Sequence, residues 1–248
     1  MRWYKKLMCY SLAMDFVSGF TTLQQEIVRC RKCPRLVEWR ERIAREKVRR
    51  FRHLQYWGRP VPAFGKPDAK LIIIGLAPAA HGGNRTGRMF TGDSSGDWLF
   101  EALYQCGFAN QPESVDRDDG LRLHDCLVTA VARCAPPQNK LLSDEIVNCR
   151  DYLNRELHLA KGKKIVLALG RVAFQVFVRL WLETGVQTKG LDLKFRHGGE
   201  WALPEGLSLL SSYHPSRQNT QTGRLTRSMF HSVFRRARSI KDTHPYGI

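Results

Sequence analysis

Residues 71–99 read Leu-Ile-Ile-Ile-Gly-Leu-Ala-Pro-Ala-Ala-His-Gly-Gly-Asn-Arg-Thr-Gly-Arg-Met-Phe-Thr-Gly-Asp-Ser-Ser-Gly-Asp-Trp-Leu, and this stretch decides the fold. An uninterrupted apolar strand, Leu71–Ile74, leads into a loop of Gly, Pro, small and polar residues. A helix is predicted to begin after this loop, near Ser95. Ligands of open α/β sheets bind beyond the carboxyl ends of the strands, so the loop is a predicted pocket. It holds no Asp or Glu between Gly75 and Thr91.

Three further apolar runs predict buried strands: Leu127–Ala132, Ile165–Leu169 and Leu207–Tyr213. Predicted helices alternate with these strands, starting at Thr21 or Thr22, after Cys33-Pro34 (about Arg35 to Arg50), near Ser95, after Ser143, at Gly170 (to about Leu182) and near Arg224 (to about Ser239). Residues 185–206 are expected to form turns and a hairpin. Strands that are continuously apolar indicate an α/β fold with a parallel sheet covered on both faces.

One domain accounts for the length of the chain. We expect a flexible extension over residues 1–20, with Met14 as an alternative start, a single domain over 21–240 and a tail over 241–248. The N-terminus lacks the features of a signal peptide, and no apolar run is long enough to span a bilayer. The sequence therefore predicts a cytoplasmic protein without a membrane partner.

Charge predicts an anionic partner. Lys and Arg number 40 against 23 acidic residues, a formal net charge of +17. Nucleic acid is the commonest partner of so basic a domain.

The cysteines suggest a metal centre. The chain has seven, an odd number that argues against a disulfide framework in a cytosolic protein. Cys30 and Cys33 share one turn, Cys134 follows a predicted strand, and Cys149 lies on the core face of a predicted helix. Thiolates select iron–sulfur clusters or zinc, and both remain open at this point, as do buried structural cysteines.

A second loop follows the last predicted strand and reads His214-Pro-Ser-Arg-Gln-Asn-Thr220. It lies on the same carboxyl edge of the sheet as the loop after Gly75. Although a lone histidine is most often a core or surface residue, this position makes His214 a candidate site residue.

These two loops and the four cysteines resemble the uracil-DNA glycosylase superfamily, specifically its family 5, the iron–sulfur-containing B-type first associated with thermophiles. Tyr56-Trp-Gly-Arg-Pro-Val-Pro and Arg133-Cys-Ala-Pro-Pro-Gln-Asn-Lys are also similar, and the match covers about Val28 to Arg238. The resemblance implies a three-layer α/β/α sandwich around a four-stranded parallel sheet. It also implies a [4Fe–4S] cluster held by Cys30, Cys33, Cys134 and Cys149.

The resemblance further implies hydrolytic removal of uracil, and of other deaminated bases such as hypoxanthine, from single- or double-stranded DNA. Such an enzyme flips the base from the stack and leaves an abasic site for base-excision repair. Neither loop contains a lysine, so we expect a monofunctional enzyme without lyase activity, acting as a monomer. The alternatives are a non-catalytic iron–sulfur nucleic-acid-binding protein and a zinc hydrolase.

Site roles follow from the resemblance residue by residue. Phe90 stands where the family stacks an aromatic on the base, and His214 where it donates to the pyrimidine O2. The pocket is expected to include Gly75, Leu76, His81 and the backbone of Ala77. Many superfamily members have Asp or Asn at the position of Ala77, so Asn84 or a carbonyl near Ala77 is expected to position the water. Thr129-Ala130 replaces an Asn that reads the uracil edge in related enzymes, which predicts a broad base range.

DNA contacts are expected from the basic early helix and from residues of both loops: Arg85, Arg88, Arg217, Asn219, Arg224 and Arg227. Phosphate contacts of this kind make binding steeply dependent on salt.

Overall fold

The computed structural model describes residues 17–186 and 190–243 of the chain. The expected extension and tail lie outside these residues at 1–16 and 244–248. Both proposed boundaries need correction, because residues 17–28 form one helix and α8 (Arg227–Thr243) continues to residue 243. A helix start at Thr21 or Thr22 is therefore wrong. Phe20 is buried, which explains why the helix begins before these threonines.

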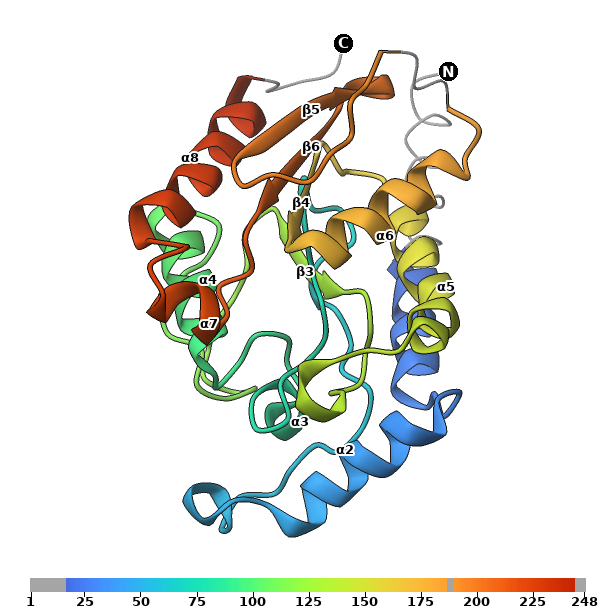
Figure 1. Cartoon of the computed structure of the whole chain (residues 1–248), viewed down its shortest axis with the longest axis vertical. Helices are drawn as coiled ribbons and strands as arrows, with labels where there is room; N and C mark the ends of the chain where they lie inside the picture. Colours follow the sequence, from blue (N-terminus) through green and yellow to red (C-terminus); the bar gives the residue numbers. More distant parts are fainter. Residues whose placement is uncertain (1–16, 187–189, 244–248) are drawn as a thin grey trace, which may run out of the picture.

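The sheet has six strands in the order β1-β3-β2-β4-β6-β5, shown in Figure 1. Its centre is the expected set of four parallel strands, namely β3 (Cys126–Ala130), β2 (Leu71–Gly75), β4 (Ile165–Leu169) and β6 (Leu207–Ser212). Two antiparallel edge strands are added, β1 (Phe64–Gly65) and β5 (Gly199–Leu203). The four-stranded expectation missed these edges, because β1 is very short and β5 alternates buried and exposed residues.

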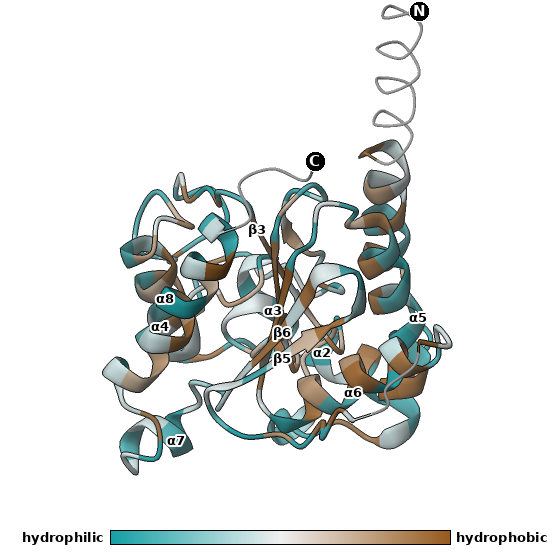
Figure 2. Ribbon diagram, turned by 90° about the horizontal axis from the view of Figure 1, so that it is seen from above, coloured by the Kyte–Doolittle hydropathy of each residue, from teal (hydrophilic) through white to brown (hydrophobic). Residues whose placement is uncertain are grey.

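Successive residues of β2 face opposite layers. Leu71 and Ile73 join the core beneath α4 (Ser94–Gln105) and α8, whereas Ile72 and Ile74 join the core beneath α5 (Ser143–Leu159) and α6 (Arg171–Leu182). All five residues of β2 are buried, as expected for a parallel strand covered on both sides. Figure 2 shows these two helix pairs on opposite sides of the brown strands.

Six further elements of the described residues lie between these helices and strands. They are α2 (Pro34–Glu46), α3 (Gly83–Thr86), α7 (Arg217–Gln221) and the 3-10 turns Arg49–Phe51, Pro137–Asn139 and Pro204–Gly206. The expected second helix to Arg50 ends earlier, since Lys47 turns to a φ of 54°. Among the described residues of 185–206, where a hairpin is expected, the structure has one strand, β5, which pairs with the last strand β6 across the turn Pro204–Gly206. No helix of the described residues is long and apolar enough to cross a membrane.

Candidate active site

Two strand-end loops meet at the carboxyl edge of the sheet. The loop after β2 carries Phe90, and the loop after β6 carries His214. Their rings stack with centroids 5.8 Å apart and planes inclined by 27°. The Ser95 hydroxyl, at the start of α4, donates to the Pro215 carbonyl at 2.9 Å and ties the two loops together. The predicted approach of these loops is therefore present in the structure.

Phe90 is fixed by its neighbours. A Cβ at Gly75 would lie 2.6 Å from Cζ of the Phe90 ring, so the ring edge occupies the space that a side chain there would take. Phe90 is 8% exposed and has a φ of 53°, a left-handed conformation that is costly for a non-glycine residue. The surrounding loop holds the ring in this conformation.

His214 is partly exposed, but the surrounding atoms desolvate its ring and lower its pKa to about 4. The imidazole is therefore neutral near pH 7 and has one N–H to donate. Its main chain is held by the Asn219 side-chain amide, which donates to the His214 carbonyl at 2.8 Å. Asn219 thus orients the loop after β6.

The interior of the loop after β2 is built on two buried arginines. The Arg88 guanidinium donates to Asp119 at 2.6 and 2.8 Å and to Thr91 at 2.8 Å. Burial alone would raise the pKa of Asp119, but Arg88 lowers it to about 2. Arg85 donates to the His81 carbonyl at 2.9 Å and stacks on Phe51. Both arginines are 5% exposed or less, so the expectation that they bind DNA phosphates does not fit this geometry.

Asn84 and His81 belong to the same loop as Phe90, and their side-chain hydrogen bonds run to Arg40 and Tyr56. Asn84 is fully buried in α3, and its side-chain amide donates to the Arg40 carbonyl at 3.2 Å. Its Oδ1 is buried without a hydrogen-bond partner. His81 Nδ1 lies 3.1 Å from the Tyr56 hydroxyl, which fixes this part of the loop, and burial lowers the His81 pKa. Leu76 and Ala77, directly after β2, are partly exposed.

Thr129 points away from the pocket. Its hydroxyl donates at 2.6 Å to Glu156 of α5, on the other face of the sheet, and the side chain is fully buried. Thr129 therefore does not take over the hydrogen bonding to the uracil edge that the resemblance assigns to an Asn in related enzymes.

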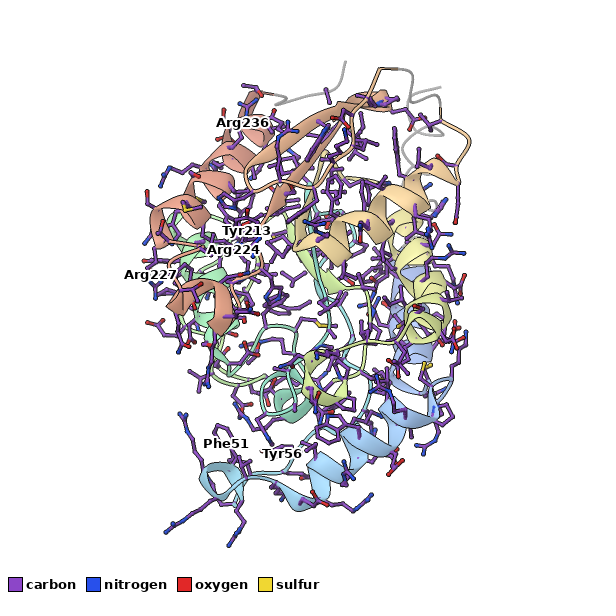
Figure 3. All side chains as sticks on the ribbon, viewed as in Figure 1. Phe51, Tyr56, Tyr213, Arg224, Arg227 and Arg236 are labelled. Atoms are coloured by element: carbon purple, nitrogen blue, oxygen red, sulfur yellow. The ribbon has the colours of Figure 1, made fainter. Side chains whose placement is uncertain are left out.

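The predicted DNA contacts of the second loop are open to solvent. Arg217 and Arg224 are exposed, and the Arg224 guanidinium lies 4.6 Å from the Tyr213 ring centroid. Arg227 pairs with Glu101 and stacks on Trp98. Figure 3 shows Tyr213, Arg224 and Arg227 together on one side of the molecule.

The four predicted cysteine ligands line one small cavity together with Arg40, Arg133 and Tyr152. Burial raises the pKa of the Cys134 thiol to about 11 and that of Cys149 to about 12. In the described part of the chain, no three His, Cys, Asp or Glu side chains are arranged around a single metal ion. A [4Fe–4S] cluster contains four irons, and each iron binds one cysteine. Its cysteine ligands therefore lie farther apart than the ligands of a single ion. The donor set of four converging thiols fits that group.

Two buried arginines at this cavity escaped the sequence analysis. The Arg40 guanidinium donates to Cys134 Sγ at 2.9 Å and to the Cys30 carbonyl at 3.2 Å. Arg133 pairs with Glu156, while its Nε and Nη1 are buried without partners. Arg40 follows the buried Leu36 and Val37 at helical spacing, which was the available signal. Cationic side chains suit a cavity that would hold thiolates.

An aromatic–imidazole pair at the carboxyl edge of an open α/β sheet is typical of ligand-binding α/β proteins. The family model described as "Uracil DNA glycosylase superfamily" matches residues 62–238, so the chain belongs to that superfamily.

Within the superfamily it belongs with the type-5 enzymes. A type-5 uracil-DNA glycosylase of Thermus thermophilus is 48% identical over 216 residues, which cover 87% of this chain and 95% of the relative. A second, from Pyrobaculum aerophilum, is 43% identical over 211 residues (85% and 88%). A type-4 uracil-DNA glycosylase of Archaeoglobus fulgidus is 28% identical over 160 residues (63% and 70%).

Proposed function

We propose that this chain is a monofunctional DNA glycosylase that flips uracil out of DNA and hydrolyses its N-glycosidic bond, leaving an abasic site. The stacked pair of Phe90 and His214, in a member of this family, is the observation that carries the proposal. Phe90 offers an aromatic face to an extruded base. Neutral His214 donates to the base oxygen, where negative charge grows as the bond breaks.

Water is positioned without a carboxylate in this proposal. Breaking the bond before water attacks leaves a cationic sugar that needs little activation of its nucleophile. General-base help is worth about 10²–10⁴-fold, and stabilising the leaving base offsets part of that loss. The unpartnered Oδ1 of Asn84 supports a role in holding this water, and a main-chain carbonyl near Ala77 is the alternative. Replacing Asn84 with Ala should slow single-turnover base release, whereas an unchanged rate excludes this role.

A broad base range is the second part of the proposal. Because its hydroxyl is engaged by Glu156, Thr129 does not discriminate uracil from hypoxanthine by a hydrogen bond. Turnover of uracil combined with inertness toward hypoxanthine would contradict it.

We further propose a [4Fe–4S] cluster at Cys30, Cys33, Cys134 and Cys149, where four thiols and two buried guanidiniums share one cavity. The cluster would hold four parts of the chain together and supply no step of base release. Purified protein should be brown with broad visible absorbance and contain iron and sulfide. Colourless protein containing zinc would favour a zinc site at these cysteines.

DNA contacts are assigned to Arg217 and Arg224, with Asn219 orienting the loop between β6 and α7. Residues 17–243 are proposed to act as one domain and as a monomer in the cytoplasm, next to the nucleoid.

The decisive experiment incubates the pure protein with duplexes carrying uracil, hypoxanthine or an ordinary base, followed by alkaline cleavage of abasic sites. We expect cleavage of the uracil duplex, and a loss of at least about 10²-fold in the His214→Ala variant, the scale of losing one donor to a developing oxyanion. Binding without base release from any duplex would favour the alternative, a non-catalytic iron–sulfur nucleic-acid-binding protein.

A further inference from the structure

A basic segment projects beside the active-site loop. We define the basic arm as residues 47–54, Lys-Val-Arg-Arg-Phe-Arg-His-Leu. Its cations Arg49, Arg50 and Arg52 are exposed, and no acidic residue occurs between Glu46 and Asp68. Within residues 17–186 and 190–243, no carboxylate forms an ion pair with these three arginines. These three arginines are therefore available to bind an anionic partner outside the chain.

The arm is joined to the loop that carries Phe90. The Phe51 ring contacts two guanidiniums, with its centroid 4.2 Å from Cζ of Arg85 and 5.0 Å from Cζ of Arg50. Just after the arm, the Tyr56 hydroxyl contacts the His81 ring. The main-chain N–H of Trp57 donates to the Arg85 carbonyl at 2.8 Å. These contacts set the position of the arm relative to the pocket, because Arg85 and His81 belong to the same loop as Phe90.

The arm and α7 flank this loop. In Figure 1 the arm extends beyond α3 at one end of the molecule, whereas α7 lies between the arm and α8. Figure 3 places Phe51 and Tyr56 at that end, separated from Arg224 and Arg227. A DNA strand whose extruded nucleotide enters the pocket would therefore meet a basic surface on either side.

We propose that the basic arm is a second DNA-backbone contact, gripping phosphates on the side of the flipped nucleotide away from α7. This inference rests on the proposed function, since it uses the pocket to place the DNA. Extruding a base requires the backbone to be held in a distorted path, and phosphate contacts on both sides can hold it. Phe51 stiffens the arm through its two guanidinium contacts.

The test compares the wild-type protein with a triple variant, Arg49→Gln, Arg50→Gln and Arg52→Gln. The probe is a duplex with a stable abasic-site analogue, titrated at several salt concentrations. Each lost phosphate contact removes about 0.9 from the slope of log K against log salt, so the slope should fall by about 2–3 and low-salt binding weaken about 10- to 100-fold.

Two further variants separate DNA contact from structure and from net charge. Changing Arg49, Arg50 and Arg52 to Lys keeps the charge and should restore most of the binding, which a purely structural role would not predict. A charge-matched control changes Arg155, Arg179 and Arg236 to Gln; Arg236 lies at the opposite end of the molecule from Phe51 in Figure 3. The control should bind almost as wild type. Its melting temperature should fall by no more than the loss of two exposed ion pairs, Arg155–Glu26 and Arg236–Glu200, allows, whereas the arm variants should keep the wild-type melting temperature.

The inference is overturned if the arm variant binds as tightly as the wild type, or if the charge-matched control loses as much affinity. Failure of the proposed function is a separate result, in which the wild type releases no uracil at any DNA concentration. The comparison of DNA binding between the wild type and the arm variant would still test whether the arm contacts DNA.

Discussion

The position of the Phe90 ring depends on a close contact with Gly75. Gly75 ends β2, and the ring of Phe90 lies where a side chain at that position would begin. The Phe90 backbone has the left-handed φ of 53° needed to turn the ring toward Gly75 and His214. The glycine at this position is therefore required by a close approach, and the proposed base-stacking surface of Phe90 depends on it.

Replacing Gly75 with Ala should slow uracil release nearly as much as Phe90→Ala, because the new methyl group displaces the ring. Single-turnover assays on a uracil duplex measure this. Gly19→Ala adds the same methyl on the first helix, where the nearest atom is 3.4 Å away, and should leave the rate unchanged. Equal rates for Gly75→Ala and the wild type would show that the Phe90 ring need not stay where it is.

The desolvated imidazole of His214 predicts a pH dependence of stability. Its pKa is lowered from 6.5 to about 4, so between these values the unfolded chain binds more protons than the folded one. The free energy of unfolding should therefore fall as the pH drops from 6.5 toward 4. Urea denaturation at a series of pH values should show a smaller fall for His214→Asn than for the wild type. Parallel curves for the two proteins would contradict this desolvation.

At the scale of elements, one buried carboxylate joins three of them. Glu156 of α5 accepts from Thr129 of β3 and from Gln24 of the first helix, and it pairs with Arg133. Glu156 and Arg133 are each 1% exposed. This network links Thr129 of β3 to Arg133, which lines the cysteine cavity.

Glu156→Gln should lower the free energy of unfolding by about 3–5 kcal/mol, because it leaves the Arg133 charge buried without its partner. The matched control is Glu26→Gln, which breaks the exposed pair with Arg155 and should cost no more than about 1 kcal/mol. Urea denaturation of both variants tests this. Similar losses in the free energy of unfolding for the two variants would show that the buried pair stabilises the fold no more than the exposed one.

At the scale of the whole molecule, the cysteine cavity connects parts that are distant in sequence. Cys30 follows the first helix, Cys33 precedes α2, Cys134 follows β3 and Cys149 lies within α5. A group bound to all four would therefore clamp the N-terminal helices onto the sheet domain. It would also fix Arg40, whose carbonyl holds Asn84 of the active-site loop.

Removing the proposed cluster, by oxidation or by Cys134→Ser, should abolish the visible absorbance and lower the melting temperature by about 10 °C, equivalent to a few kcal/mol for a chain of this size. Cys106→Ser, at a buried cysteine outside the cavity, should keep the absorbance. Loss of colour without any change in melting temperature would argue against the clamping role.

The sequence by itself determined the parallel core of the sheet, the order of strands and helices, and the two loops at its carboxyl edge. Periodicity and continuous apolar runs report burial directly, and strand direction then places loop ends together. It could not determine the edge strands, whose short or alternating patterns are weak signals. It also could not distinguish buried from exposed arginines, because the burial of an arginine depends on neighbours that are distant in the sequence.

Only the tertiary structure decided which charges are free to meet a partner. Arg85 and Arg88 have internal partners and build the loop, while Arg217, Arg224 and the arginines of the basic arm face solvent. The physical reason is that desolvating a guanidinium is tolerated only where carboxylates and carbonyls surround it, and those groups come from distant parts of the chain.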